Sequence, residues 1–463
     1  MPGSLHAAMF DEMQTGEILE RAAAYAREYA AAVCEQRVFP DEQALERLNA
    51  FDEALPDGTS DALAVLEQLH SVGSPGTVAQ TGGRYFGMVN GGLVPAALGA
   101  RVLADAWDQN AVLHATSPVN AKLEEVVERW LCQLLGLPET MVAGYVSGTS
   151  MATACGLAAA RYRLLDNAGW DVNRRGLGGA PILRVVASRQ THGTVIKMLA
   201  LLGFGTDTIE WMDVDEQGRV IPEAVPKLDD RTIVIIQAGN VNSGAFDPIR
   251  SICRKARQAG AWVHVDGAFG LWAAACERLR NLTDGINLAD SLSIDAHKTL
   301  NAPYDCGIIL CADRDALVAA LQNSGAYISY TDNRDGMIYT PEMSRRGRAV
   351  DVWATLRYLD CSGVDELVWG LHERTRQFAG ELAAEGFEVL NDPVFNQVLV
   401  ACENDALTNA TIRNIQSSGE AWVGGATWFD RAVIRISVCS WATTAEDVTR
   451  TVRAFALARA EAT

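Results

Sequence analysis

The sequence predicts an α/β fold: a large domain built on a mostly parallel β-sheet, with a helical segment before it and a small α+β domain after it. Two observations support this prediction. From about residue 86, short runs rich in β-branched residues alternate with helical stretches, and the runs are apolar throughout. This alternation is typical of a parallel sheet that is buried on both faces. Of the 463 residues, 49% are hydrophobic, which is enough for a large core.

Residues 1–85 form the predicted N-terminal helical segment. Residues 11–34 and 61–71 have the spacing of amphipathic helices, and polar, proline-containing stretches join them. The segment is too small to enclose a core of its own. We therefore expect it to pack on another surface, that of a partner subunit.

Residues 86–345 contain the predicted sheet. Polar side chains follow several of its strands, and ligands of such sheets bind at the carboxyl ends of the strands. The expected strands are 182–187, 232–236, 262–265, 291–294 and 307–310, and the expected helices between them include 193–203, 249–259 and 313–321.

Residues 346–463 are expected to form the small C-terminal domain. Helices beside a few mixed strands are typical of an α+β unit. The expected elements are a helix at 349–359, strands at 387–390, 397–401 and 434–438, and a final helix at about 445–459.

Charge and composition exclude several classes of protein. The net charge of −19 argues against nucleic acid and anionic membranes as partners. The ten cysteines include no C-x-x-C pair, so we expect no disulfide framework and no metal site, and a reducing cytoplasm fits best. The N-terminus shows no signal peptide, and no apolar run reaches transmembrane length. These features predict a cytoplasmic protein.

Two charged residues stand at the ends of buried strands. Lys298 follows the strand 291–294, and Asp266 ends the strand that begins at Trp262. An amine and a carboxylate in such places are costly unless something pairs with them. Pyridoxal phosphate would pair with both, because a lysine forms a Schiff base with its aldehyde and an acid holds its pyridine nitrogen protonated.

A glycine-bearing turn precedes an alanine-rich helix at Gly144–Thr153. The N-terminus of a helix offers free N–H groups and partial positive charge, which suits a phosphate. Thr149 and Ser150 add hydroxyl donors. A plain helix cap explains the same residues equally well.

Four further polar positions are candidates for ligand binding. His192 follows the strand 182–187, where an imidazole could stack on a flat ring. Asn240 and Asn242 follow the strand 232–236 and could bond a cofactor oxygen, although a simple loop explains them too. Arg435 could hold a substrate carboxylate, but an outward-facing strand arginine is the stronger interpretation.

The same region invites a competing interpretation as a hydrolase. Gly148-Thr-Ser-Met-Ala152 looks like the nucleophile motif of subtilisin-type serine proteases, and His192-Gly-Thr194 looks like their histidine motif. The order along the chain is reversed, however, and no convincing aspartate motif precedes both. A protease would also leave Lys298 and Asp266 unexplained.

Taken together, these motifs resemble fold-type-I PLP enzymes, and specifically the group II amino-acid decarboxylases. That family includes the aromatic-amino-acid, tyrosine, histidine and glutamate decarboxylases. The resemblance runs from about Arg84 to about Val448. It implies a PLP-dependent transferase-like large domain, and a homodimer in which both chains contribute to each active site.

The resemblance also implies roles for individual residues. Lys298 resembles the Schiff-base lysine, and Asp266 resembles the partner of the pyridinium nitrogen, with Ala268 packing under the ring. Asp295 lies where the family often places a polar residue on the phosphate side, although an acid could not bind phosphate directly. His192 looks like the residue that stacks on the ring, and the residues that look like phosphate ligands are Thr149, Ser150 and His297.

The implied activity is decarboxylation of an L-amino acid, aromatic or related, to an amine and carbon dioxide. An aminotransferase or an aldolase-type carbon–carbon lyase on the same fold is the alternative. A decarboxylase needs an acid that protonates the α-carbon, and in the family a loop tyrosine often serves. The stretch 327–346 is shorter here than that loop, and Tyr339 is the first candidate, ahead of Tyr327 and Tyr330.

Overall fold

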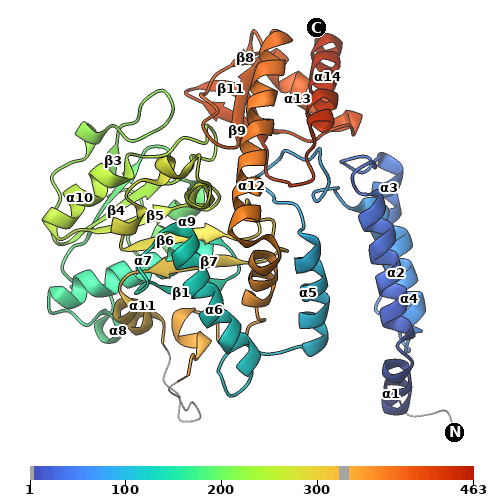
Figure 1. Cartoon of the computed structure of the whole chain (residues 1–463), viewed down its shortest axis with the longest axis horizontal. Coiled ribbons are helices and arrows are strands. Elements are labelled where there is room, and N and C mark those ends of the chain that lie inside the picture. The colour runs from blue at the N-terminus through green and yellow to red at the C-terminus, as the bar shows by residue number, and fades with distance from the viewer. Residues whose placement is uncertain (1–4, 323–332) are drawn as a thin grey trace.

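The computed structural model describes residues 5–322 and 333–463. Figure 1 shows a body built around a large sheet, a smaller sheet with long helices at one end of it, and an N-terminal helical arm that stands beside the body. Within the described ranges, no helix combines the length and apolar character needed to cross a membrane.

The large sheet has seven strands in the order β1-β7-β6-β5-β4-β2-β3, and β7 alone runs antiparallel to its two neighbours. The mostly parallel sheet is therefore confirmed, as are the five expected strands. Residues 144–146, expected in a turn, instead belong to β1. The strands are β1 (Val142–Val146), β2 (Arg184–Ser188), β3 (Glu210–Met212), β4 (Thr232–Gln237), β5 (Trp262–Asp266), β6 (Ser291–Asp295) and β7 (Gly307–Cys311).

Helices cover both faces of this sheet, which explains why its strands are apolar throughout. In β4, Val234 and Ile236 belong to one apolar core, whereas Ile233 and Ile235 belong to the core on the other face. The first core includes residues of α6, α10 and α12, and the second includes residues of α7, α9 and α11. The helices before α12 are α5 (Pro95–Trp107), α6 (Pro118–Leu135), α7 (Thr149–Asn167), α8 (Val172–Arg175), α9 (Gly193–Leu201), α10 (Ile249–Ala259) and α11 (Arg314–Leu321).

The C-terminal part combines a four-stranded antiparallel sheet, in the order β10-β11-β9-β8, with three helices. β10 was not expected, because its two glycines give it no β-branched run. The helix expected at 349–359 continues to Ala384, but Asp360 has a φ of 53° and divides it at the expected end. The elements are α12 (Ala349–Ala384), β8 (Glu388–Val389), β9 (Gln397–Ala401), α13 (Asp405–Ser418), β10 (Gly424–Trp428), β11 (Arg431–Ser437) and α14 (Ala445–Ala462).

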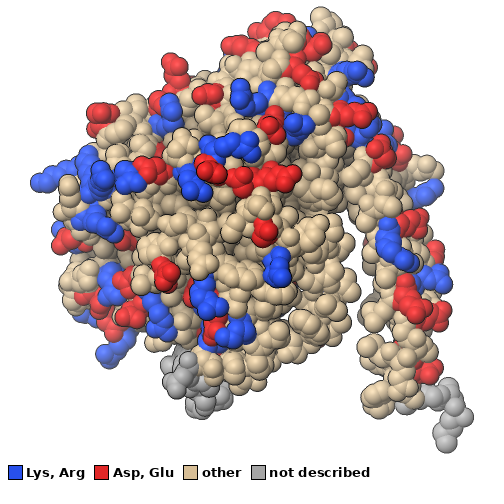
Figure 2. Space-filling model, in the orientation of Figure 1, with Lys and Arg blue, Asp and Glu red and all other residues tan. Residues whose placement is uncertain are grey.

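The N-terminal arm projects from the body, and the space-filling view shows a gap between its far end and the body (Figure 2). None of the residues in its four α-helices is buried. Gly16, with a φ of 71°, divides the expected helix 11–34 into two. The domain boundaries at 85 and 345 stay predictions. The helices of the arm are α1 (Leu5–Thr15), α2 (Glu17–Ala32), α3 (Glu42–Arg47) and α4 (Ala62–Gln68).

Short helical turns complete the described structure. Most of them are single 3₁₀ turns, a form that is common in connections between longer elements. They are η1 (Leu48–Phe51), η2 (Leu69–Gly73, a π-turn), η3 (Ser74–Gly76), η4 (Pro222–Ala224), η5 (Gly270–Ala275), η6 (Arg280–Thr283), η7 (Ile286–Leu288) and η8 (Gly336–Tyr339).

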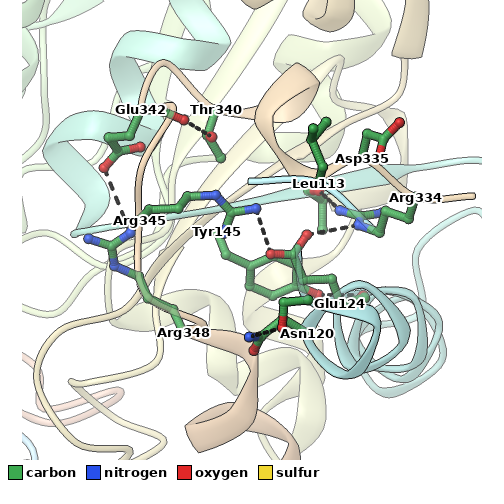
Figure 3. A network of polar contacts seen from close by, with 12 residues as sticks. Leu113, Asn120, Glu124, Tyr145, Arg334, Asp335, Thr340, Glu342, Arg345 and Arg348 are labelled. Atoms are coloured by element: carbon green, nitrogen blue, oxygen red, sulfur yellow. Dashed lines mark hydrogen bonds and ion pairs between the residues drawn. The ribbon is translucent and has the colours of Figure 1, made fainter. Parts of the chain in front are cut away.

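A buried ionic network fastens residues 333–348 to α6 and β1 (Figure 3). Glu124 of α6 lies at its centre, with Oε2 3.0 Å from Arg334 Nε and Oε1 2.7 Å from Arg345 Nη2. Arg334 also contacts Glu128 at 2.8 Å and donates a hydrogen bond to the carbonyl of Ala143 in β1. Buried charges persist only when they are paired in this way, so the network fixes where this segment runs.

Candidate active site

A cavity of about 390 Å³ opens where three neighbouring parallel strands of the large sheet end. Gln237, Asp266 and Asp295 are the last residues of β4, β5 and β6, and all three line it. This is the edge at which ligands of such sheets bind. The other lining residues are Ser147, Gly148, Thr149, Ser150, His192, Thr194, Gly239, Val241, Ala268, Phe269, His297, Lys298 and Tyr304.

Lys298 and Asp266 face this one cavity, as their positions in the sequence predicted. Lys298 lies in the turn after β6, and its Nζ is 3.1 Å from Oδ2 of Asp295. Asp266 is buried, and its Oδ1 accepts a hydrogen bond from the backbone N–H of Ala268 at 3.1 Å. Burial raises the pKa of the Asp266 carboxyl, and the nearby His192 and Lys298 oppose this shift.

The N-terminus of α7 forms another wall of the cavity. The backbone N–H of Thr149 donates to Oδ1 of Asp295 at 2.6 Å. The hydroxyl of Thr149 is buried, and among the described residues it has no hydrogen-bond partner. A Cβ at Gly307 would lie 2.3 Å from the backbone of Gly148, so a glycine is needed there to let the turn approach β7. The free hydroxyl and the helix N-terminus fit a phosphate group.

His192 forms the N-cap of α9 and lines the cavity. Its Nδ1 accepts the backbone N–H of Thr194 at 3.3 Å and lies 2.8 Å from the hydroxyl of the same residue. Burial lowers the pKa of His192, and Asp266 partly offsets this effect. The ring is therefore neutral at neutral pH, with its proton on Nε2, which suits stacking on a flat ring.

His297 is held in a fixed orientation. Its Nδ1 accepts the backbone N–H of Cys306 at 3.1 Å, and its ring stacks on Tyr304 with centroids 4.2 Å apart. Burial lowers the pKa of His297. Because Nδ1 accepts a hydrogen bond, the neutral ring carries its proton on Nε2. That nitrogen lies 3.7 Å from Oδ2 of Asp295.

Several of the candidate residues, Asn240, Asn242 and Tyr339 among them, do not line the cavity. Asn240 is buried, and its Oδ1 accepts the N–H groups of Asn242 and Ser243, so it shapes its own loop. Tyr339 packs under Arg334, and its hydroxyl accepts a hydrogen bond from Arg314 Nε at 3.2 Å. Tyr327 and Tyr330 lie outside the described residues.

Sequence reasoning missed other lining residues, among them Gln237, Phe269 and Tyr304. A signal existed for Gln237, because it ends β4 just as Asp266 ends β5. Arg435 does not project outward. Its guanidinium donates to the carbonyls of Val241 and Met88, beside the loop that lines the cavity.

The chain is similar in sequence to several known proteins. Residues 45–401 match the family model described as the pyridoxal-dependent decarboxylase conserved domain. The chain is 29% identical over 330 residues to the mouse acidic amino acid decarboxylase GADL1, a match that covers 68% of this chain and 59% of that protein. It is 28% identical over 334 residues to the mouse cysteine sulfinic acid decarboxylase, covering 68% and 66%. The match to the aromatic-L-amino-acid decarboxylase of Bacillus atrophaeus is 28% over 435 residues and covers 86% of each chain. The chain thus matches under two thirds of the length of the two mouse relatives.

Solved structures confirm the fold. Mouse CSAD in its apo form superposes with a TM-score of 0.88 at 22% identity, over 96% of this chain and 99% of that one. Oryza sativa TDC with PLP and tryptamine also gives a TM-score of 0.88, at 21% identity, over 100% and 99%. The fold-type-I architecture is therefore confirmed. The match to the pyridoxal-dependent family model confirms pyridoxal phosphate as the cofactor. With its family model matched over most of its length, this chain belongs to the pyridoxal-dependent decarboxylase family.

Proposed function

We propose that the protein is a PLP-dependent carboxy-lyase that converts an L-amino acid, aromatic or related, to an amine and carbon dioxide. One observation carries the proposal: Lys298, Asp266 and the N-terminus of α7 all line a single cavity. They supply an amine for the aldehyde, an acid for the ring nitrogen and an N–H cradle for the phosphate.

The cofactor supplies an electron sink for the pair released when a bond to the α-carbon breaks. The protein's own groups bind and orient it. Asp266, buried at the end of β5, would hold the proton on the ring nitrogen. His192 and Ala268 line the same cavity and would contact the ring, and Lys298 would provide the amine for the aldehyde.

The charges in the cavity support a neutral or aromatic side chain in the substrate. Among the described lining residues, Lys298 is the single lysine or arginine, and it serves the cofactor, whereas the guanidinium of Arg435 beside the cavity donates to the backbone carbonyls of Val241 and Met88. An acidic side chain would need a second cation. Phe269, Tyr304 and Val241 add apolar surface instead.

The position of Tyr339 favours a second candidate function, that of an aminotransferase or aldolase-type lyase. Its hydroxyl is bonded to Arg314 rather than directed into the cavity. Among the described residues, the group that protonates the α-carbon in a decarboxylase thus has no assigned residue. His192 and water are candidates within the cavity, and Tyr327 and Tyr330 lie outside the described residues.

Products from a panel of L-amino acids test the proposal. We expect carbon dioxide and the matching amine in equal amounts, with aromatic substrates turned over fastest. A keto acid without carbon dioxide would establish transamination instead. Borohydride should fix the cofactor to the peptide that contains Lys298, and Lys298→Ala, the control, should show neither labelling nor turnover.

A further inference from the structure

Asp295 places a carboxylate in the cradle that our proposed function assigns to the cofactor's phosphate. Its Oδ1 accepts the N–H of Thr149 at 2.6 Å. Its Oδ2 lies 3.1 Å from Nζ of Lys298 and 3.7 Å from Nε2 of His297. The residue is only 2% exposed, so water does not screen these contacts.

A phosphate would seek the same partners. α7 is 19 residues long, and its N-cap residue, Gly148, has no side chain that could cap the helix. Its first N–H and the positive end of its dipole attract anions. The free, buried hydroxyl of Thr149 completes a cradle that Asp295 fills only in part.

The two anions cannot share this cradle without cost. A phosphate monoester carries about −1.5 to −2 charges at pH 7, and like charges repel strongly in a buried site. One hydrogen on the Thr149 amide also cannot serve two acceptors at full strength. A neutral residue at this position would have neither conflict.

We propose that Asp295 is an internal competitor for the cofactor's phosphate. In the cofactor-free chain its carboxylate holds the α7 N-terminus and pairs with Lys298, and the phosphate displaces it from the Thr149 amide on binding. This inference rests on the cradle assigned under the proposed function. Its consequence is that the enzyme holds its cofactor more weakly, and exchanges it faster, than the same site without this charge would.

The test removes the charge with two variants, Asp295→Asn and Asp295→Ala. Asp290→Asn is the matched control. Asp290 directly precedes β6, the strand that ends at Asp295, and it accepts the backbone N–H of Val263, away from the cavity. Binding of inorganic phosphate to protein from which the cofactor has been removed is measured by calorimetry. Release of pyridoxal phosphate from the diluted holoenzyme is followed by visible absorbance.

We expect both Asp295 variants to bind inorganic phosphate at least roughly tenfold more tightly than the parent and to release the cofactor more slowly, with the control unchanged. A misfolded variant does not gain affinity, so a loss of structure cannot mimic this result. Equal or weaker phosphate binding in both variants would overturn the proposal and leave Asp295 as a helix cap. Neither measurement needs turnover, so this outcome is separate from the fate of the proposed function.

Discussion

Gln237 and Asp266 stand directly opposite each other as register partners at the ends of β4 and β5. Both line the cavity. The backbone N–H of Gln237 donates to Asp247 at 2.7 Å, and among the described residues nothing bonds its side-chain Nε2. An uncharged amide donor therefore shares one wall of the cavity with the buried carboxylate that we assign to the cofactor's ring nitrogen.

Asp266→Asn should keep the fold and lower kcat by about a hundredfold or more, because an amide cannot hold the ring nitrogen protonated. Asparagine can still accept the N–H of Ala268, so we expect an unchanged Tm. Steady-state kinetics on cofactor-loaded protein checks this, with visible absorbance as the control for loading. Turnover near the parent rate would show that Asp266 is not the partner of the ring nitrogen.

Tyr339→Phe separates the two roles considered for this residue. From its bond to Arg314 we expect a stability loss of about 1 kcal/mol and amine formation close to that of the parent. Tyr304→Phe is the matched variant, since it removes a hydroxyl from a residue that does line the cavity. If Tyr339→Phe instead abolishes amine formation while carbon dioxide is still released, Tyr339 is the proton donor that the family resemblance implied.

Glu124→Gln should destabilise the protein by about 3 kcal/mol, because it leaves the buried guanidinium groups of Arg334 and Arg345 short of a counter-charge. Glu125→Gln, on the exposed side of the same helix, should cost less than about 1 kcal/mol. Urea unfolding of both variants measures the difference. Equal effects would mean that the network of Figure 3 contributes no net stability.

Asp290 should make the stability depend on pH. Burial raises its pKa to about 6, whereas an unfolded chain has about 3.9. Between these two pKa values the folded state holds a proton that the unfolded state has lost. The contribution of Asp290 to the free energy of unfolding is therefore greatest below pH 4 and is lost as the pH rises through 6. Relative to the parent, Asp290→Asn should therefore gain about 2–3 kcal/mol of unfolding free energy between pH 4 and pH 7.5. A constant difference in urea unfolding across this range would contradict the assignment.

The N-terminal arm should mediate a homodimer. Leu5, Met9, Phe10 and Met13 of α1 are each more than half exposed, which is unusual for side chains of this kind. We expect a dimer in sedimentation at assay concentration, and a shift toward monomer with Phe10→Glu and Met13→Glu together. Glu12→Gln on the same helix is the control. An active protein that sediments as a monomer would refute the prediction.

The large sheet could be predicted because its sequence signal is local. A parallel strand covered on both faces must be apolar throughout, so five strands could be recognised from short runs alone. The positions of Lys298 and Asp266 followed from the same logic, since charged residues at the ends of such strands point to a ligand. β10 gave no such signal, because its two glycines leave it without a run of β-branched residues. It forms because it pairs in antiparallel fashion with β11.

What the sequence by itself determined was therefore the fold class, the cofactor and about half of the residues that line the cavity. Contacts between distant segments decided the rest. The ionic network around Glu124 places Tyr339 beside Arg314 instead of in the cavity, and no local pattern around Tyr339 reports that pairing. Likewise, Asp295 meets the Thr149 amide, 146 positions away along the chain, only because β6 ends and α7 begins at the same edge of the sheet. Such charge relationships depend on three-dimensional distance, which the order of residues along the chain does not specify.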